Sequence, residues 1–347
     1  MVVRLSRHRL LALLCGVVAA LTLATPALAT PIPVGAVRSD AAAGWLARQL
    51  VDGERFEAVF DGVAYPDQGL TLDAVFAFAA AGVADDFGAP ALAWISQPSV
   101  RDGYIGDGTT EAYAGATAKL ALAVAVRGGD PTDVGGVDLI ARLRSLQTPG
   151  GRFTDQSAWG DFSNAFSQSF AILALKRTAQ GVPAVAAGWL AGTRCPDGGY
   201  PLLPAQPVCT SDVDATALVV QALRAAGRWA DAAAGLRWLV SVQRADGGFT
   251  NIDGVANANS TGLAAQALRD GGRPLAWLRA RVFLAGLQVG CTAPPANRGA
   301  VDFDGGAFDP GTAIRATAQA VLGLTGTGYA RLSTTTATTG APTLVCR

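Results

Sequence analysis

A repeated motif constrains the fold of this chain more than any other feature. Its clearest copy runs from Trp238 to Phe249, with a Trp-Leu pair, then Gln243, then a Gly-Gly turn that ends in an aromatic residue. Self-similarity at a regular spacing of about 40 to 50 residues is typical of repeat architectures. Looser copies begin at Trp45, Trp94, Leu143, Trp189 and Phe283.

Each copy is followed by a segment rich in Ala and other small apolar residues. These segments begin near Thr71, Ala112, Ser167, Asp214, Ser260 and Ile314, and most of them end in Gly. A terminal Gly is typical of a left-handed helix C-cap, and Ser, Thr, Asp or Asn at the start is typical of an N-cap. No segment alternates apolar and polar residues over a sustained stretch, so strands should be few. The sequence therefore predicts six helix pairs.

The character of the second helices predicts how the pairs are arranged. Helices that are apolar on all sides are buried, which places the Ala-rich helices in an inner layer and the Trp-Leu helices around them. An open solenoid would need polar repeats at both ends, and no such repeats are evident. We predict an all-α chain with a single α6/α6 toroid over residues 30–332 and few or no strands.

The first residues have the features of a secretory signal peptide. Arg4, Arg7 and Arg9 precede an apolar run, and Ala27 and Ala29 form an A-x-A cleavage site. The apolar run is shorter than the roughly 20 residues that span a bilayer. We therefore predict a Sec-type signal peptide over residues 1–29, a secreted protein, and no transmembrane anchor after cleavage.

Removal of residues 1–29 would also remove His8, which is the only histidine. Without imidazole, Ser-His-Asp sites, Cys-His sites and zinc sites that use histidine are excluded. Three of the 27 basic residues and no acidic residue would leave with the signal. The remaining chain would have 24 basic and 27 acidic residues, a net charge of about −3. This balance argues against nucleic acid as a partner, and we predict neither a metal nor a cofactor.

Four cysteines remain after Cys15 is lost with the signal, which indicates two disulfides in an exported chain. Pairing by proximity in sequence favours Cys195–Cys209 and Cys291–Cys346, although the other connectivities remain open. The segment 333–347 is rich in Thr, and we expect it to be a tail that Cys346 ties back to the domain.

The motif W-L-x-x-x-Q-x-x-x-G-G-F at Trp238–Phe249 resembles the QW repeat of squalene cyclase and prenyltransferase-type α/α toroids. The resemblance covers essentially residues 40–330 and implies the toroid fold. A weaker similarity connects the chain to transcobalamin-like α6/α6 binding barrels, whose smaller ligand-closing domain is missing here. In toroids of this kind, the turns before the inner helices line one mouth of the barrel.

The sequence places polar and aromatic residues in those turns. They can act as helix caps, or together they can form the rim of a ligand-binding mouth. The candidate ligand-binding residues are Glu111, Tyr113, Trp159, Asn164, Gln168, Asp212, Asp214 and Asn259.

The stretch Asp212–Ala217 resembles the D-x-D-D-T-A motif of class II terpene cyclases. The resemblance implies that Asp214 is the acid that protonates an alkene or epoxide and that Asp212 supports it. Ala215 stands where the family has a third carboxylate, and no histidine is present to assist. Those cyclases also pair two helical domains, whereas this sequence predicts one.

Other activities of related folds fit less well. The zinc of protein prenyltransferases needs a histidine ligand, and the C-G-E-Q thioester sequence of complement-type toroids is absent. Glu111 with Asp212 or Asp214 would be a carboxylate pair of the kind that glycoside hydrolases use, but no sequence resemblance supports it.

We therefore predict a secreted, monomeric toroid that binds a small or extended ligand at the polar mouth without catalysis. The ligand would be a small molecule, an isoprenoid or an extracellular polymer. The first alternative is a diverged class II terpene cyclase that uses Asp214, and the second is an extracellular protein-interaction scaffold. A cyclase needs an aromatic-walled pocket beside Asp214, whereas an Asp214 that caps its own helix would exclude it.

Overall fold

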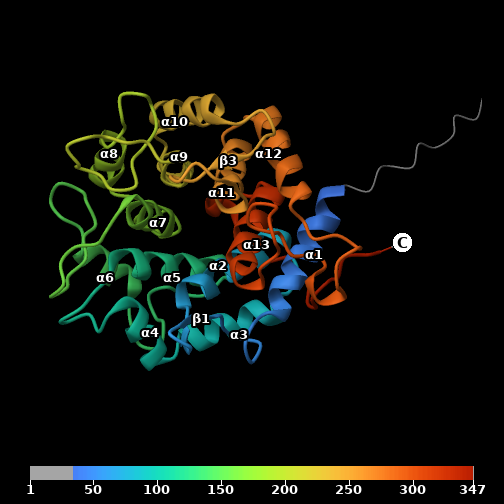
Figure 1. Ribbon diagram of the computed structural model, residues 1–347. Helices are drawn as coiled ribbons and strands as arrows, with labels where there is room; N and C mark the ends of the chain where they lie inside the picture. Colours follow the sequence, from blue (N-terminus) through green and yellow to red (C-terminus); the bar gives the residue numbers. More distant parts are fainter. Residues whose placement is uncertain (1–33, 347) are drawn as a thin grey trace, which may run out of the picture. The chain divides into compact units, whose positions relative to one another are not determined.

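Six helices form a closed inner ring in the computed structural model, which describes residues 34–346. Each packs against the next, and the last packs against the first to close the ring (Figure 1). The signal peptide expected over residues 1–29 lies outside the described residues. The inner helices are α2 (Gln68–Ala81), α5 (Ala114–Val126), α7 (Ala165–Leu175), α9 (Val213–Ala225), α11 (Ala258–Asp270) and α13 (Pro310–Thr325).

The remaining helices surround this ring and pair with its members. Two short 3₁₀ helices, η1 (Pro295–Asn297) and η2 (Tyr329–Arg331), complete the helical elements of the described chain. The predicted α6/α6 toroid with two helical layers is confirmed. The outer helices are α1 (Val34–Arg48), α3 (Asp85–Ile95), α4 (Pro98–Ile105), α6 (Leu139–Ser145), α8 (Ala184–Gly192), α10 (Trp229–Val242) and α12 (Pro274–Gly286).

The outer partner of α5 differs from the prediction because it is split into α3 and α4. Pro98 occupies the first turn of α4, where its fixed φ and missing N–H suit a helix start. Gly103 and Tyr104, which the motif places in a turn, therefore lie inside α4. The turn comes instead at Gly106, whose φ of 83° favours glycine.

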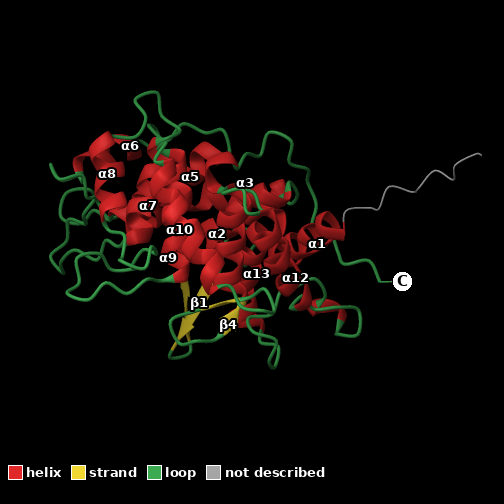
Figure 2. Cartoon of the chain, turned by 90° about the horizontal axis from the view of Figure 1, so that it is seen from above, coloured by secondary structure: helices red, strands yellow, loops and turns green. Residues whose placement is uncertain are grey.

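Two small antiparallel sheets lie at one end of the barrel (Figure 2). The hairpin β1 (Glu57–Phe60) and β2 (Val63–Pro66) leads into α2, and β3 (Phe249–Thr250) pairs with β4 (Ala256–Asn257) immediately before α11. All six inner helices begin at this end, which we call the mouth. The opposite end, where they finish, we call the closed end.

One hydrogen bond explains why the motif turn and the inner helix recur together. In four repeats, the backbone N–H of a buried residue that ends the turn donates to a threonine hydroxyl on the following inner helix at 2.8 to 3.0 Å. In a fifth repeat, Phe153 N–H donates to the side-chain oxygen of Gln168 at 2.8 Å. The four threonine pairs are Phe56–Thr71, Tyr200–Thr216, Phe249–Thr261 and Val301–Thr317.

The sixth copy of the motif is displaced from its predicted position. Val301, and not Phe308, makes the turn-to-helix bond, and it also forms a β-bridge with Gln288. Phe308 packs edge-on against Trp45, with ring centroids 6.4 Å apart. The Gly-Gly pair at 305–306 therefore belongs to a later loop.

Two of the motif glutamines, Gln243 and Gln288, connect neighbouring repeats. The Gln243 amide donates to the Ala276 carbonyl of the next outer helix at 2.9 Å. Gln288, in the last repeat, donates to the Arg38 carbonyl of α1 at 2.9 Å and to the Gly299 carbonyl at 3.0 Å. The Arg38 guanidinium donates back to the Gln288 side-chain oxygen at 3.2 Å. These bonds join the last repeat to the first.

The lumen of the barrel is filled at the closed end by the segment that contains η2. The Tyr329 ring lies edge-on to Phe76 and Phe170, with centroid separations of 5.3 and 5.5 Å. Its backbone N–H donates to Gln221 of α9 at 3.0 Å, and its carbonyl accepts from Arg177 at 3.0 Å. Because Tyr329 is only 2% exposed, the closed end has no open passage into the barrel at this residue.

Both disulfides have the connectivity that proximity favours, Cys195–Cys209 and Cys291–Cys346. The chain after Leu332 is also held by backbone bonds, since Thr338 and Gly340 exchange hydrogen bonds with Gly82, Ala84 and Asp85 at the end of α2. Among residues 34–346, no helix combines the length and the apolar character needed to cross a membrane.

Replacing Gln288 by leucine should lower the free energy of unfolding by about 2 kcal/mol, because two backbone carbonyls lose a buried donor. Urea denaturation measures this loss. Gln49→Leu is the matched control, since Gln49 directly follows α1 and its amide donates to the Trp45 carbonyl of that helix. This change should cost about 0.5 kcal/mol. Equal losses in both variants would contradict the ring-closing role of Gln288.

Candidate functional site

The mouth is built from helix starts, and most of its polar residues cap those helices. Asn164 accepts the backbone N–H groups of Phe166 and Ser167, and Asp212 accepts that of Ala215 at 2.7 Å. Asp67, Asn257 and Asp309 do the same for α2, α11 and α13. For Asn164 and Asp212, the structure therefore shows the capping interaction, which satisfies otherwise unpaired N–H groups.

Gln168 lies inside the protein, with 2% of its surface exposed. Its amide N–H donates to the Phe153 carbonyl at 2.6 Å, and its side-chain oxygen accepts the Phe153 N–H at 2.8 Å. Both functional groups of this side chain thus hold the turn before α7.

Glu111, Tyr113 and Trp159 lie where the loop 155–163 folds against the start of α5. Glu111 accepts the Ala158 N–H at 3.1 Å, and the Ser157 hydroxyl lowers the pKa of the Glu111 carboxyl. A hydrogen bond to Glu111 is the main cause of the raised pKa of Tyr113. Trp159 is 82% exposed at the tip of the loop. These residues hold the loop rather than converging on a cavity.

Asp155, at the start of the same loop, is a helix-capping residue that the sequence did not predict. Its carboxylate accepts the Ala114 N–H at 2.8 Å, so a residue from the following repeat caps α5. Tyr113, which precedes the helix, makes no side-chain cap. A cap that comes from 41 residues away leaves no local sequence signal.

Asp214 also lies at the mouth but, unlike Asp67, Asp212 and Asp309, it caps no helix. It lies in the first turn of α9, and the Ser260 hydroxyl on the adjacent helix α11 donates to its carboxyl. One carboxyl oxygen, Oδ1, is buried and has no hydrogen-bond partner. Burial raises the pKa of Asp214 to about 6 against the lowering effect of the Ser260 bond, and the charge of Asp212 adds to the rise. The carboxyl is therefore ready to hold a proton in mildly acidic solution.

Asn259 stands next to Ser260 and connects this region to a cavity. Its side-chain oxygen is also buried without a partner. The cavity has a volume of about 520 Å³ and lies at the mouth between the starts of α2, α11 and α13, beside β1. Its apolar lining residues are Ala58, Val59, Leu70, Phe303 and Ile314, and its polar ones are Glu57, Asp67, Asn259, Thr312 and Arg315.

An ion-paired layer lies at the mouth end of the inner ring. Lys119 of α5 contacts Asp73 of α2 at 2.6 Å, and its ammonium group lies 5.7 Å from the centroid of the Phe170 ring. Arg315 of α13 contacts Asp67 at 3.3 Å and Asp73 at 3.8 Å. Lys119 was not predicted, although a single lysine in an otherwise apolar inner helix was a usable signal.

The candidate residues therefore form two groups rather than one site. Asp212, Asp214 and Asn259 belong to the adjacent helices α9 and α11, whereas Glu111, Tyr113 and Trp159 belong to the loops before α5 and α7. Within residues 34–346, no group of three or more His, Cys, Asp or Glu side chains is arranged to hold a metal ion.

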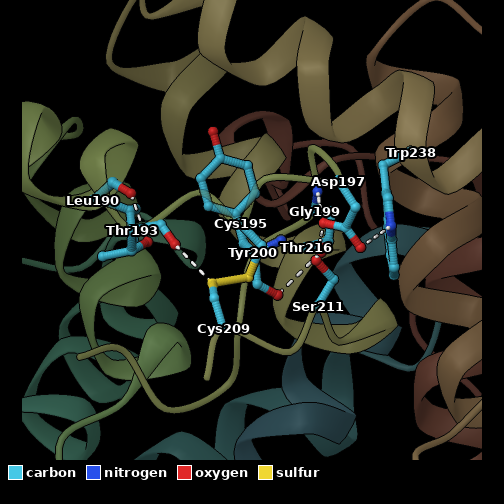
Figure 3. The surroundings of a disulfide bond; sticks show 10 residues. All are labelled: Leu190, Thr193, Cys195, Asp197, Gly199, Tyr200, Cys209, Ser211, Thr216 and Trp238. Atoms are coloured by element: carbon cyan, nitrogen blue, oxygen red, sulfur yellow. Dashed lines mark hydrogen bonds between the residues drawn. A yellow bond between two sulfur atoms is a disulfide. The ribbon is translucent and has the colours of Figure 1, made fainter. Parts of the chain in front are cut away.

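The disulfide Cys195–Cys209 anchors the segment that leads into α9 (Figure 3). Asp197 accepts the Ser211 hydroxyl at 2.6 Å and the Trp238 indole N–H at 3.0 Å. Asp212 forms a β-bridge with Tyr200, and the backbone N–H of Tyr200 donates to the Thr216 hydroxyl. The segment that carries Asp212 and Asp214 is thus held on both sides.

The sequence matches no protein-family model and no curated protein. The structure resembles that of a protein from Actinoplanes, with a TM-score of 0.59 and 15% identity over 85% of this chain and 99% of that one. It also resembles the type II terpene cyclase MstE from Scytonema in its apo form, with a TM-score of 0.60 and 15% identity over 85% of this chain and 98% of MstE. An MstE variant bound to its substrate, geranylgeranyl dihydroxybenzoate, gives a TM-score of 0.61 and 15% identity over 86% of this chain and 98% of that one.

These similarities confirm the toroid fold that the motif implied, at identities that carry no information on activity. They also correct one argument from the sequence. Because nearly all of MstE aligns with one toroid of this size, a type II terpene cyclase does not require a second helical domain. The chain has the α/α-toroid fold of type II terpene cyclases.

Replacing Asp214 by asparagine should stabilise the protein near neutral pH. A folded-state pKa of about 6 lies above the ordinary value of 3.8, so wild-type stability falls as the pH rises through this window and stays low above it. Asparagine cannot ionise, and we expect a gain of about 2 kcal/mol at about pH 7.5 and almost none at about pH 4. Urea denaturation at the two pH values measures the difference.

Asp212→Asn is the control for this experiment, because asparagine also caps helices. We expect little change from it at either pH. A gain from Asp214→Asn that is the same at both pH values would show that the buried charge is not its cause.

Proposed function

We propose that this protein binds an isoprenoid-type small molecule in the mouth cavity, without chemical conversion. The observation that carries the proposal is the cavity of about 520 Å³ between α2, α11, α13 and β1. Small-molecule sites are concave, mostly apolar and supplied with a few polar groups, and they typically enclose about 300 to 1,000 Å³.

The cavity has apolar lining residues for the hydrocarbon part of an isoprenoid alcohol or ester and polar ones for its head group. Leu70, Phe303 and Ile314 would cover the hydrocarbon part and exclude water from it. Asn259, a polar lining residue, would offer its side-chain amide to a hydroxyl group of the ligand. Arg315, whose side chain is 45% exposed, would face a polar head group.

The β1–β2 hairpin next to the cavity carries apolar side chains that are exposed rather than packed in the core. Val59 and Phe60 are 69% and 66% exposed, and Val63 and Tyr65 are about half exposed. Val59 also lines the cavity. A ligand chain that extends from the cavity along this hairpin would cover part of that surface and gain the transfer free energy of burial.

The structural neighbours support the same class of ligand. A toroid of nearly the same extent, MstE, holds a geranylgeranyl compound. This bound compound in a protein of similar fold supports a prenyl ligand, and the choice of ligand for the present chain is our proposal.

We infer that the protein acts outside the cytoplasm as a monomer. The sequence features of residues 1–29 support export, and so do the two disulfides, which persist in oxidising compartments.

Replacing Thr312 by tryptophan should fill the cavity and weaken binding of geranylgeraniol at least about tenfold, because a bulky side chain displaces the ligand. Thr312 is exposed at the start of α13 and its hydroxyl bonds to the Asp309 carbonyl, so the fold should tolerate the change. Isothermal titration calorimetry with detergent-solubilised geranylgeraniol measures the affinity.

Thr132→Trp is the matched control, since Thr132 is likewise an exposed threonine bonded to a preceding aspartate, Asp130. It should leave the affinity unchanged. Equal affinities of wild type and Thr312→Trp would rule out the mouth cavity as the binding site.

Acid catalysis by Asp214 is the second candidate function, and the observation that favours it is a buried carboxyl with one oxygen, Oδ1, that has no hydrogen-bond partner and a pKa that burial raises to about 6. The Asp214 proton would form a C–H bond with one carbon of an alkene, and the neighbouring carbon would become a cation. A second double bond would attack this cation, which closes a ring and moves the positive charge to another carbon. Transfer of a proton from the carbon next to that charge to the Asp214 carboxylate would form a new double bond, regenerate the acid and leave a cyclic isomer. Asp212 caps α9, so the Asp214 carboxyl is not needed for that cap.

If this reaction occurs, geranylgeraniol should yield a cyclised isomer of equal mass that gas chromatography separates. Asp214→Asn should abolish product while binding persists, because asparagine carries no transferable proton. The rate should also fall as the pH rises above about 6, where the acid loses its proton. Product from Asp214→Asn, or none from wild type at about pH 5, would refute the cyclase hypothesis.

A further inference from the structure

A second and larger cavity, of about 710 Å³, lies at the closed end of the barrel. It is bounded by the loop after α7, the turn between α9 and α10, and the segment that contains η2. None of its lining residues belongs to the mouth. The residues that matter for its chemistry are Lys176, Arg224, Trp229, Asp270 and Arg331.

The charged lining of this cavity is unbalanced. Asp270 is the only acidic residue in it and contacts both Arg224, at 3.2 Å, and Arg331, at 3.0 Å. Lys176 is exposed and has no ion-pair partner among residues 34–346. Three cations against one carboxylate leave two positive charges that face the same space.

Trp229 provides an aromatic surface in the same cavity. It is the first residue of α10 and is 60% exposed. The Arg224 guanidinium lies 4.9 Å from its ring centroid, a distance at which the cation stabilises the ring. Asp270 pairs with the same guanidinium at 3.2 Å, so Arg224 is held beside the ring before any ligand binds.

We propose that the closed-end cavity binds a small aromatic anion. Its carboxylate or phosphate pairs with Lys176 and Arg331, and its ring stacks on Trp229. Charge-assisted hydrogen bonds from lysine and arginine to such oxyanions are among the stronger polar contacts. Stacked rings add binding free energy beyond the area that they bury. The volume of the cavity lies within the range of small-molecule sites.

The experiment uses the whole protein and probes that separate charge from ring. The probes 2-naphthoate and 2-naphthyl phosphate carry the ring with a carboxylate or a phosphate, 2-naphthol carries the ring without charge at neutral pH, and inorganic phosphate carries charge without a ring. Indole N–H signals in nuclear magnetic resonance spectra report binding, with the Trp229 signal assigned from Trp229→Ala. We expect the naphthyl anions to shift this signal and to bind at least about tenfold more tightly than 2-naphthol or phosphate. Stronger binding of one naphthyl anion identifies its acidic group as the preferred one.

Variants test each contact of the proposal. Lys176→Gln and Arg331→Gln should each weaken binding of the anions by about tenfold and leave 2-naphthol unchanged, since only the charge contact is lost. Trp229→Ala should weaken the anions and 2-naphthol alike. Arg228→Gln and Trp159→Ala are matched controls, because Arg228 bonds to Asp231 outside the cavity and Trp159 is an exposed tryptophan at the mouth. Both should bind the anions like wild type.

Raised salt should also weaken the anions selectively, because it screens exposed charges. The proposal is overturned if no naphthyl anion shifts the Trp229 signal, if 2-naphthol binds as tightly as the anions, or if the control variants lose as much affinity as Lys176→Gln. Thr312→Trp, which fills the mouth cavity, should not alter this binding, so the result is independent of the function proposed for the mouth.

Discussion

A single kind of buried hydrogen bond joins the turn to the inner helix in five of the six helix pairs of this toroid. The turn that ends the motif places a backbone N–H in the core, and leaving such a group unpaired costs about 1 to 3 kcal/mol. A threonine on the inner helix accepts it in four repeats, and Gln168 does so in a fifth. In the second repeat, where the outer helix is split, Tyr113 N–H bonds instead to the Ile105 carbonyl, and the Thr117 hydroxyl is left without a partner. The helix pair therefore deviates where this bond is missing.

The direction of the inner helices gives the two ends of the barrel opposite chemistry. All six begin at the mouth, where negative side chains are favourable because helix N-termini carry partial positive charge. Asp67, Asp212 and Asp309 cap helices there. At the closed end, cations such as Lys176 and Arg224 complement the helix C-termini. Because Tyr329 and its aromatic neighbours fill the lumen between the two ends, each end forms a cavity of its own.

The two aspartates at the start of α9 have different roles because of one residue of spacing. Asp212 stands at the N-cap, where its carboxylate reaches the Ala215 N–H. Asp214 lies two residues further on, in the first turn of α9 and next to Ser260 of α11, so its charge is poorly solvated and its pKa is raised. The capping interpretation of the sequence therefore holds for Asp212 but not for Asp214.

The sequence by itself determined the toroid and its repeat count, because burial periodicity, Gly turns and small inner-helix residues are local properties that every unit repeats. It also supported both disulfides, since each pair is nearest in the chain. Only the tertiary structure showed that Asp155 caps α5 and that Asn259 lines a cavity with Phe303, because these contacts join separate repeats. The same holds for the closed-end cavity, whose residues come from four segments far apart in sequence. Local pattern decides which helices form, but the closure of the ring decides which side chains meet.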